Sequence, residues 1–372
     1  SVDAIGKNST QFYGATKQNG QDNYLAGAQD NGSWISQGNN TDKSKTYNFV
    51  FGGDGYEALW HYNKPGDFLV TSQYGRVGRY KQNVFLGNAD IADSGNSGVS
   101  PFYSKISNAD NNPDAVFTIS RNGVWRSIDF GDNWALTPII ASFAPNNNSA
   151  LNVEVSTADP NVVWAGGAMR ENGTLSLHVS EDNGLTFTKT NSFDDPRNNH
   201  SYNISGIGTS YTIRDRAYAL FSSQGAAKVL KTEDLGSTWE DITGKGFSRI
   251  PDVAVHSILE MPFDSNMLWV GTDIGLFEST DGGENWNFVN DMIPVAIYDM
   301  RIVNDQVIFA TYGRGIWTAT LNELSDYEPV VFLSSPEVST AQKSLNSLKT
   351  LVSYNVTANQ VSKVKIFIIH LD

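Results

Sequence analysis

The sequence predicts an all-β fold: a seven-bladed β-propeller followed by a partial immunoglobulin- or fibronectin-like β segment. Three repeated features predict it. They are a turn motif of serine, aspartate and glycine, a strand that begins at a glycine, and a second strand just before that glycine. No stretch of comparable length shows the 3.6-residue period of a helix. The 372 residues suffice for one propeller with a large core.

The turn motif has the form [ST]-x-D-x-G-x-x-[WF] and recurs about every 50 residues. Its carboxylate can accept backbone N–H groups, its glycine can take a positive φ, and its aromatic residue can pack between blades. Recurrence in successive units favours a structural turn; a calcium loop is the alternative, although it needs more oxygen ligands. The copies are Ser127, Asp129, Gly131 and Trp134; Ser180, Asp182, Gly184 and Phe187; Thr232, Asp234, Gly236 and Trp239; and Ser279, Asp281, Gly283 and Trp286.

A short strand that begins at a glycine precedes each turn motif and recurs three more times. Another β-branched or aromatic strand lies before each copy, behind turn-forming residues. The repeating unit is therefore strand, turn, strand, loop, strand, turn, strand, and seven such units predict seven blades. The glycines are Gly32, Gly75, Gly123, Gly173, Gly225, Gly275 and Gly315, and the preceding strands start at residues 23, 67, 114, 161, 216, 266 and 306.

These turns resemble Asp-boxes, also called BNR repeats, of the sortilin- and sialidase-like propellers. Four phrases resemble exported Asp-box proteins of Bacteroidota in particular: LAGAQDNGSW (25–34), FGGDG (51–55), LWVGTDIGLFESTDGGENW (268–286) and ATYGRGIW (310–317). The resemblance covers residues ~10–322. It implies the propeller fold and a bacterial, exported protein, but it says little about activity because this repeat serves many functions.

The amino-acid composition limits the classes of binding partner and the cellular location that we expect. The net charge of −14 makes nucleic acid and anionic lipid poor partners. The absence of cysteine excludes thiol catalysis, disulfides and zinc–thiolate sites. No apolar run is long enough to span a membrane. The chain begins SVDAIGKN, which suggests a processed or excised segment. We expect a secreted, extracellular or cell-surface protein.

The loops between the second and third strands are expected to open together around the central channel, opposite the Asp turns. Their amides, aromatics and arginines could bind hydroxyl groups and stack on sugars, so they could form a carbohydrate or peptide surface. The alternative is that these side chains are polar only because loops face water. The ligand-binding candidates are Gln29, Gln73, Tyr74, Arg121, Arg170, Tyr312 and Arg314.

A glycoside hydrolase would need two carboxylates beside the scissile bond. Four loop carboxylates could supply the pair, although Asp54 within FGGDG is better interpreted as part of a tight turn. The tripeptide Arg249-Ile250-Pro251 is similar to a sialidase signature, but it stands before the fourth Asp turn rather than the first. The five histidines show no metal-ligand spacing, so we predict no metal and no cofactor. The catalytic candidates are Asp30, Asp54, Glu171 and Asp273.

After the last blade the pattern changes. Residues 1–324 form the predicted propeller, and residues 325–372 form the predicted start of a sandwich-like module. VVFLSSP, TLVSYNVTA and KVKIFII are expected strands, but a complete sandwich needs about 100 residues. We therefore expect a longer multidomain chain; a small accessory hairpin is the alternative.

The function predicted from the sequence is that of a non-catalytic propeller that binds a glycan or an extracellular protein. One alternative is a glycoside hydrolase or lyase acting on polysaccharide. A second is a structural module of an extracellular assembly. A deep cleft with two carboxylates would favour hydrolysis, whereas open aromatic rings would favour binding.

Overall fold

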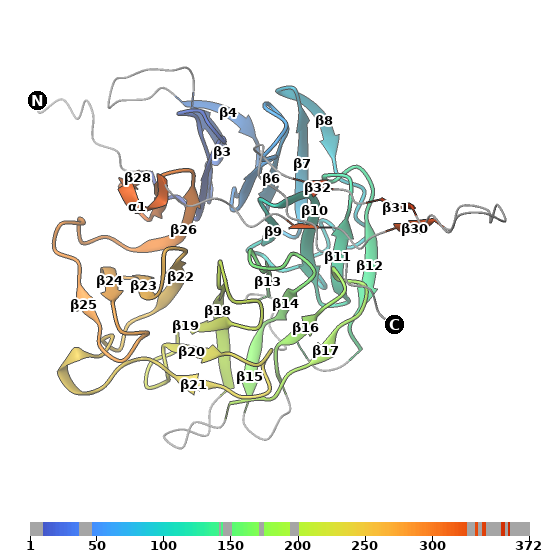
Figure 1. The fold of residues 1–372 in the computed structure, drawn as a ribbon. Coiled ribbons are helices and arrows are strands. Elements are labelled where there is room, and N and C mark those ends of the chain that lie inside the picture. Colours follow the sequence, from blue (N-terminus) through green and yellow to red (C-terminus); the bar gives the residue numbers. More distant parts are fainter. Residues whose placement is uncertain are drawn as a thin grey trace, which may run out of the picture.

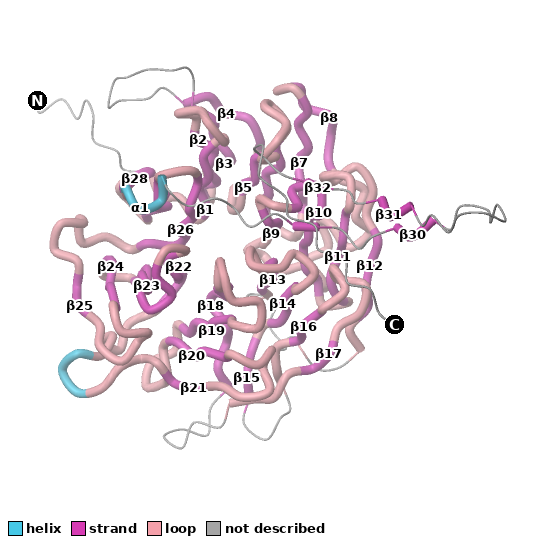
Figure 2. The backbone as a smooth tube through the Cα atoms, in the orientation of Figure 1, coloured by secondary structure: helices cyan, strands magenta, loops and turns pink. Residues whose placement is uncertain are grey.

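The computed structural model describes residues 10–36, 47–140, 143, 151–170, 175–193 and 201–325, together with four short strands beyond them. Seven small antiparallel sheets stand around a central axis (Figure 1). Figure 2 shows that strands and loops make up nearly all of the described chain. The predicted all-β, seven-bladed propeller is confirmed.

The first three blades each have four strands in chain order. Blade 1 contains β1 (Gly14–Lys17), β2 (Tyr24–Ala28), β3 (Gly32–Ser36) and β4 (Tyr47–Phe51). Blade 2 contains β5 (Ala58–Trp60), β6 (Phe68–Ser72), β7 (Arg76–Lys81) and β8 (Val84–Asn88). Blade 3 contains β9 (Ile106–Ala109), β10 (Asn112–Ser120), β11 (Gly123–Ser127) and β12 (Ala135–Pro138).

The remaining blades vary slightly. Blade 4 contains β13 (Asn152–Val155), β14 (Val163–Gly166), β16 (His178–Ser180) and β17 (Thr188–Lys189). Blade 5 contains β18 (Ser201–Thr209), β19 (Ala217–Phe221), β20 (Val229–Thr232) and β21 (Glu240–Asp241), with β15 (Ala168–Arg170) paired to β18. Blade 6 contains β22 (Val255–Met261), β23 (Asp264–Thr272), β24 (Gly275–Ser279) and β25 (Asn287–Phe288). Blade 7 contains β26 (Ile297–Val303), β27 (Gln306–Thr311) and β28 (Gly315–Thr320). A 3₁₀ turn, η2 (Gly246–Ser248), precedes blade 6, and the short helix α1 (Asn322–Ser325) follows blade 7.

The first strand of each blade lines the channel, and neighbouring first strands contact one another around the whole ring, including β26 with β1. The ring closes without a covalent link. Phe12 N donates to Thr311 O at 3.1 Å, and Gly315 N donates to Thr10 O at 3.1 Å. Among the described residues, blade 7 has three strands, so β28 has no fourth-strand partner in its sheet.

The core lies between adjacent blades. One cluster joins blades 3 and 4 through Phe117, Val153 and Val163, all 2% exposed or less. Alternation along the strands places such side chains toward the neighbouring sheet, because successive residues point to opposite faces. Each interface removes apolar area from water, worth about 25 cal/mol per Å². The fold is therefore stabilised by contacts between blades as well as by hydrogen bonds within each sheet.

The four Asp turns share one hydrogen-bond pattern. In blade 6, Ser279 Oγ donates to Asp281 Oδ1 at 2.8 Å and accepts from Gly283 N at 2.9 Å. Asp281 Oδ1 also accepts from the backbone N–H of Asn285 at 2.9 Å. Hydrogen bonds from Asn285 and Ser279 lower the pKa of Asp281, because they favour the charged carboxylate. The pattern repeats at Ser127, Ser180 and Thr232.

The turns also connect the blades. Trp286, which is 3% exposed, donates its indole N–H to Ile242 O of the preceding blade at 2.8 Å. The motif glycines lie against the preceding blade too. A Cβ on Gly184 would lie 2.5 Å from the Phe117 ring, and one on Gly283 would lie 2.8 Å from Ile242. The turn glycine is required for close approach as well as for its positive φ.

Three predicted third strands begin later than expected; in blade 2 the strand starts at Arg76, one residue after Gly75. In blade 5 the strand starts at Val229 rather than at Gly225, because Lys228 turns inward. Its ammonium donates to Ser223 O at 2.6 Å and pairs with Asp252 at 2.6 Å, which holds 223–228 as a loop. In blade 4 the third strand starts at His178, and Gly173 lies outside the described residues.

The C-terminal segment shows two short strand pairs. β29 (Phe332–Leu333) pairs with β32 (Val356–Thr357), and β30 (Glu337–Ser339) pairs with β31 (Leu351–Ser353). The predicted KVKIFII strand lies outside the described residues. The predicted sandwich-like module and its boundary at 325 stay predictions.

Candidate functional site

Five tyrosine rings gather at one mouth of the central channel, on the face of the second-to-third-strand loops. Tyr13 lies in the middle, and the others surround it in edge-on or tilted contacts, which ring quadrupoles favour. We call these five residues the tyrosine cluster. The centroid of Tyr13 lies 5.3 Å from that of Tyr56, 5.4 Å from Tyr103, 4.9 Å from Tyr298 and 5.6 Å from Tyr312.

The topology explains why these rings meet. Strand direction alternates within a blade, so every first strand starts at the face where the second strand ends. Tyr13, Tyr56 and Tyr103 stand just before β1, β5 and β9, and Tyr298 is the second residue of β26. Tyr312 follows β27 on the same face. Residues at equivalent places in different blades therefore converge on one mouth.

The aromatic surface continues beyond the cluster on both sides. Phe102 is 36% exposed, and its ring centroid lies 5.9 Å from that of Tyr56 and 5.4 Å from that of Tyr74. On the other side the His256 ring stacks on Tyr298 at 4.2 Å, with 10° between the ring planes. His256 Nε2 lies 2.7 Å from Asp273 Oδ1. Burial lowers the pKa of His256 despite this carboxylate, so the ring is neutral at pH 7.

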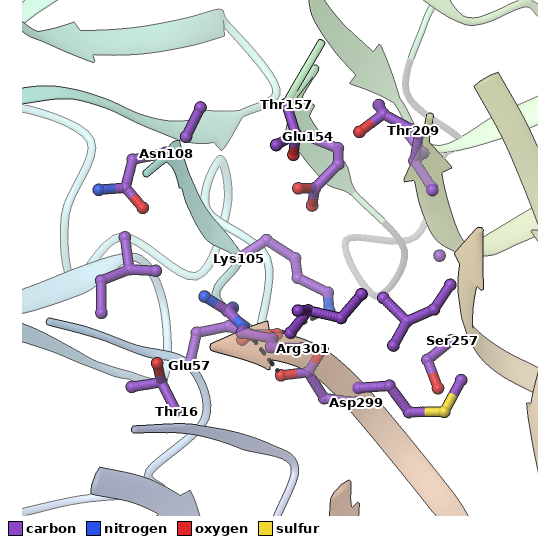
Figure 3. A pocket seen from close by; sticks show the side chains of 18 of the residues that line it. Thr16, Glu57, Lys105, Asn108, Glu154, Thr157, Thr209, Ser257, Asp299 and Arg301 are labelled. Atoms are coloured by element: carbon purple, nitrogen blue, oxygen red, sulfur yellow. Dashed lines mark hydrogen bonds and ion pairs between the residues drawn. The ribbon is translucent and has the colours of Figure 1, made fainter. Parts of the chain in front are cut away.

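A buried charge cluster adjoins the tyrosine cluster through the hydrogen bond from Tyr103 to Glu57. We call Glu57, Lys105, Asp299 and Arg301 the channel charge cluster (Figure 3). Glu57 Oε1 accepts from Lys105 Nζ at 2.6 Å and from the Tyr103 hydroxyl at 2.9 Å. Arg301 donates to Glu57 Oε2 at 2.9 Å and to Asp299 Oδ2 at 3.1 Å. The Glu57 side chain is 1% exposed. Blades 2, 3 and 7 are thus joined by ion pairs across the channel.

Charge pairing fixes the protonation of this cluster. Burial alone would raise the pKa of Glu57, but the Lys105 ammonium and the Arg301 guanidinium hold that pKa below its usual value. Burial raises the pKa of Asp299, and the nearby Glu57 carboxylate adds to the rise. Gly14 in β1 leaves the room that Glu57 needs, since a Cβ there would lie 2.6 Å from its carboxylate oxygen.

The channel around this cluster is narrow and polar. Its cavity of about 140 Å³ is lined by the charge cluster and by Asn108, Asp110, Glu154 and Thr157, among others (Figure 3). Burial raises the pKa of Glu154 to about 7 and that of Asp110 to about 6. A water occupies roughly 30 Å³, so the cavity has room for a few waters and not for an oligosaccharide. Chemistry on a polymer would have to occur outside it.

The first loop candidates from the sequence lie beside the tyrosine cluster, where they are joined by hydrogen bonds. Gln29 Oε1 accepts from the Tyr13 hydroxyl at 2.7 Å. Asp54 Oδ1 accepts from the backbone N–H of Asp30 at 2.8 Å, and Gln73 Oε1 accepts from the N–H of Asp54 at 2.8 Å. Asp30 itself is exposed, with φ of 61°. Asp54 and Gln73 therefore hold loops of blades 1 and 2 together, whereas Gln29 binds Tyr13 within blade 1.

The other candidates are more dispersed. Tyr74 has φ of 62°, and its carbonyl accepts from Gly95 N at 2.6 Å. Arg314 is exposed beside Tyr312, and Arg121 is half-buried in blade 3. Arg170 belongs to β15, and Glu171 lies outside the described residues. The structure thus brings together Gln29, Asp30, Tyr312 and Asp273 around the tyrosine cluster, with Tyr74 at its edge.

Four of the five residues of the tyrosine cluster were not predicted from the sequence. Tyr13, Tyr56, Tyr103 and Tyr298 stand at or just before first strands, outside the second-to-third-strand loops in which the sequence predicts the site. One signal could have found them: an aromatic residue or histidine recurs at the entrance of successive first strands, as in YGAT (13–16), YEAL (56–59), YSKI (103–106), HSIL (256–259) and YDMR (298–301). The channel charge cluster follows the same positions by one to three residues.

A second hollow of about 420 Å³ lies between blades 7 and 1, beside the seam. Apolar walls from Phe12, Trp34, Tyr47 and Ile316 are joined by Thr10, Gln11 and Asn31.

In the part of the chain that the structure describes, no set of three or more His, Asp or Glu side chains is placed to hold a metal ion. Within that same part, no helix is long and apolar enough to cross a bilayer.

No protein-family model and no curated protein sequence matches the chain. Solved propellers do match its fold. YCF48 from Cyanidioschyzon merolae superposes with a TM-score of 0.60 at 10% identity, over 86% of this chain and 97% of that one. The GH74 xyloglucanase from Xanthomonas campestris gives 0.61 at 16% identity, over 85% of this chain but 53% of that one, so this chain spans about half its length. A structure of YCF48 bound to D1 peptide gives 0.55 at 14% identity, over 86% and 93%. At these identities the similarity shows the fold alone.

Proposed function

We propose that this chain is a non-catalytic binding propeller that holds a glycan or a protein partner at the tyrosine-lined mouth. The observation that carries the proposal is the unbroken run of aromatic rings from Tyr74 to His256. Tyrosine offers a large, rigid, amphipathic contact area at low entropic cost, and its rings stack on sugars and on peptide groups alike. Tyr56 is buried at 1% exposure and supports the others, whereas the half-buried Tyr13, Tyr298 and Tyr312 and the exposed Phe102 are accessible to a partner.

The geometry supports binding better than hydrolysis. Of the four catalytic candidates, Asp54 holds the Asp30 backbone and Asp273 pairs with His256. The carboxylates inside the channel are either ion-paired, as Glu57 and Asp299 are, or enclosed in a cavity too small for a sugar chain. A glycosidase needs a free acid and a second carboxylate flanking the bond in an accessible cleft. This arrangement does not favour that chemistry.

Two further proposals accompany this one. The repeated turns support assignment of the chain to the Asp-box propellers, and the resemblance to exported Bacteroidota proteins supports a secreted or cell-surface location. Both YCF48 bound to a D1 peptide and a xyloglucanase share the fold, so the comparisons support a protein ligand and a glycan ligand alike.

The test is parallel screening of glycan and peptide arrays with the wild-type chain and with a Tyr298→Ala, Tyr312→Ala variant. We expect ligands whose binding is lost in the variant while the products of each bound glycan remain unchanged by mass spectrometry. Phe85→Ala on β8 is the matched control, since Phe85 is an exposed aromatic, 49% accessible, on an outer strand. Shortened glycans would favour the hydrolase, and ligands bound equally by the variant would place the site elsewhere.

A further inference from the structure

We propose that the tyrosine-lined mouth recognises a positively charged side chain, an arginine or lysine carried by an extended protein segment. This inference rests on the proposed function, because it names the ligand class for the same face. Tyrosine ring faces carry negative partial charge and attract cations within about 6 Å of the centroid. Tyr13, Tyr298 and Tyr312 lie within contact distance of one another and are half-buried, so they form the part of the cluster that can offer this attraction to a ligand.

The chain already uses this chemistry on the inner side of the cluster. Lys105 Nζ lies 4.7 Å from the centroid of the Tyr103 ring while it pairs with Glu57. The protein therefore already contains one ammonium group that is bound by a tyrosine ring face and a carboxylate together. The outer side of the cluster offers the same two components, ring faces and carboxylates, to a ligand.

Carboxylates stand on both sides of the outer surface. Asp30 is exposed and follows Gln29, whose side chain is bonded to Tyr13. Asp273 is 49% exposed and pairs with His256, which stacks on Tyr298. Their negative field reaches the rings: after burial, Asp273 contributes to the raised pKa of Tyr298, and Asp30 adds a smaller contribution to that of Tyr13, behind those of Tyr312 and Tyr298. Charge complementarity therefore favours a cationic group between these aspartates.

One positively charged residue, Arg314, opposes the negative field of these aspartates, and its substitution can distinguish a cationic ligand from a neutral one. Arg314 is exposed on the loop that carries Tyr312. Its charge repels a cationic ligand, so Arg314→Gln is expected to strengthen binding. A neutral glycan would respond little to this change, because its contacts with the rings do not depend on charge.

The probes are three heptapeptides of otherwise neutral sequence with arginine, lysine or citrulline at the centre, and a panel of neutral oligosaccharides. Citrulline keeps the shape of arginine and removes its charge. Calorimetric titration of the wild-type chain at 20 and 300 mM NaCl should show the arginine peptide binding at least tenfold more tightly than the citrulline peptide, with weaker binding at high salt. Asp273→Asn and Tyr298→Leu should each reduce the affinity several-fold, and Phe85→Leu should leave it unchanged.

The outcomes separate the two proposals. Equal binding of the arginine and citrulline peptides overturns the cationic ligand but leaves the binding face intact if Tyr298→Leu still weakens both. Oligosaccharide binding that depends on Tyr298 overturns it as well and supports a glycan at the same face. If no ligand of either class responds to Tyr298→Leu, the proposed function fails too. Asp273→Asn keeps the test valid if Tyr298→Leu does not fold, since Asp273 is a half-exposed loop residue.

Discussion

At the scale of single residues, two constraints act on the glycine of each Asp turn. Gly184 has φ of 77°, and a Cβ there would lie 2.5 Å from the Phe117 ring of the preceding blade. Gly20 has a similar φ of 66° but no atom near its Cβ position. The pair therefore separates backbone strain from inter-blade contact.

We expect Gly184→Ala to destabilise the protein more than Gly20→Ala does. Strain alone should cost about 1–2 kcal/mol in each variant, and overpacking against Phe117 should add about 1–3 kcal/mol. Urea unfolding followed by tryptophan fluorescence measures both free energies. Equal losses in the two variants would mean that the blades move apart at no cost.

Glu154 predicts how stability depends on pH. Its folded pKa of about 7 lies above the usual glutamate pKa of 4.5, because burial disfavours the carboxylate. The folded state therefore holds a proton that the unfolded state releases between those pH values. The stability that this proton contributes is present at pH 4.5 and is lost as the pH rises through 7.

Glu154→Gln should reduce the loss of stability between pH 5 and pH 8. Asp110 and Asp299 act in the same direction, so some loss should remain. The measurement is the free energy of unfolding at both pH values, with exposed Glu284→Gln as the control. An unchanged difference in the Glu154 variant would show that Glu154 titrates normally.

At the scale of elements, β28 and the residues before β1 form the seam of the ring. Phe12 is 5% exposed and packs with Ile308 and Ala310 of blade 7, so it joins blade 7 to blade 1. Phe12→Ala should cost about 3–5 kcal/mol because it leaves a cavity at the seam. The exposed Phe247 is the control, and Phe247→Ala should change the unfolding midpoint little. A small effect at Phe12 would indicate that the seam is held by its backbone bonds instead.

The strands and the Asp turns could be predicted because their signals are local. Glycine, turn residues and alternation act within a few positions, and they recur in successive blades. The start of β20 could not be predicted, because it depends on Lys228 pairing with Asp252, which lies beyond the next turn. Most of the tyrosine cluster was missed for a related reason: its five rings come from four blades, and only closure of the propeller brings Tyr13 against Tyr298.

At the scale of the whole molecule, the channel charge cluster connects blades that are distant in sequence. Arg301 of blade 7 donates to Glu57 of blade 2, and Glu57 also accepts from Lys105 of blade 3. Removing one partner of a buried ion pair leaves charge without compensation. The cluster therefore makes the stability of one side of the ring depend on the other.

Arg301→Met should destabilise the fold by about 3–5 kcal/mol, although methionine fills much of the same volume. Denaturant unfolding measures the loss, and the exposed Arg249→Met is the matched control. The affinity for the proposed ligand should fall too, because Arg301 positions Glu57, and Glu57 accepts the hydrogen bond from the Tyr103 hydroxyl. A variant as stable as the wild type would show that the remaining charges neutralise one another.

The non-covalent seam also determines how the propeller responds to tension. When residues 10 and 325 are pulled apart, the hydrogen bonds from Gly315 to Thr10 and from Phe12 to Thr311 bear the force first. These bonds join the first and last blades, and the other blades lie between those two in the sequence. Once the seam parts, the blades should peel away singly. A blade of about 50 residues extends by roughly 170 Å when stretched. Single-molecule force spectroscopy should therefore record a sawtooth with steps near that length, and one abrupt rupture would show that the ring fails as a unit.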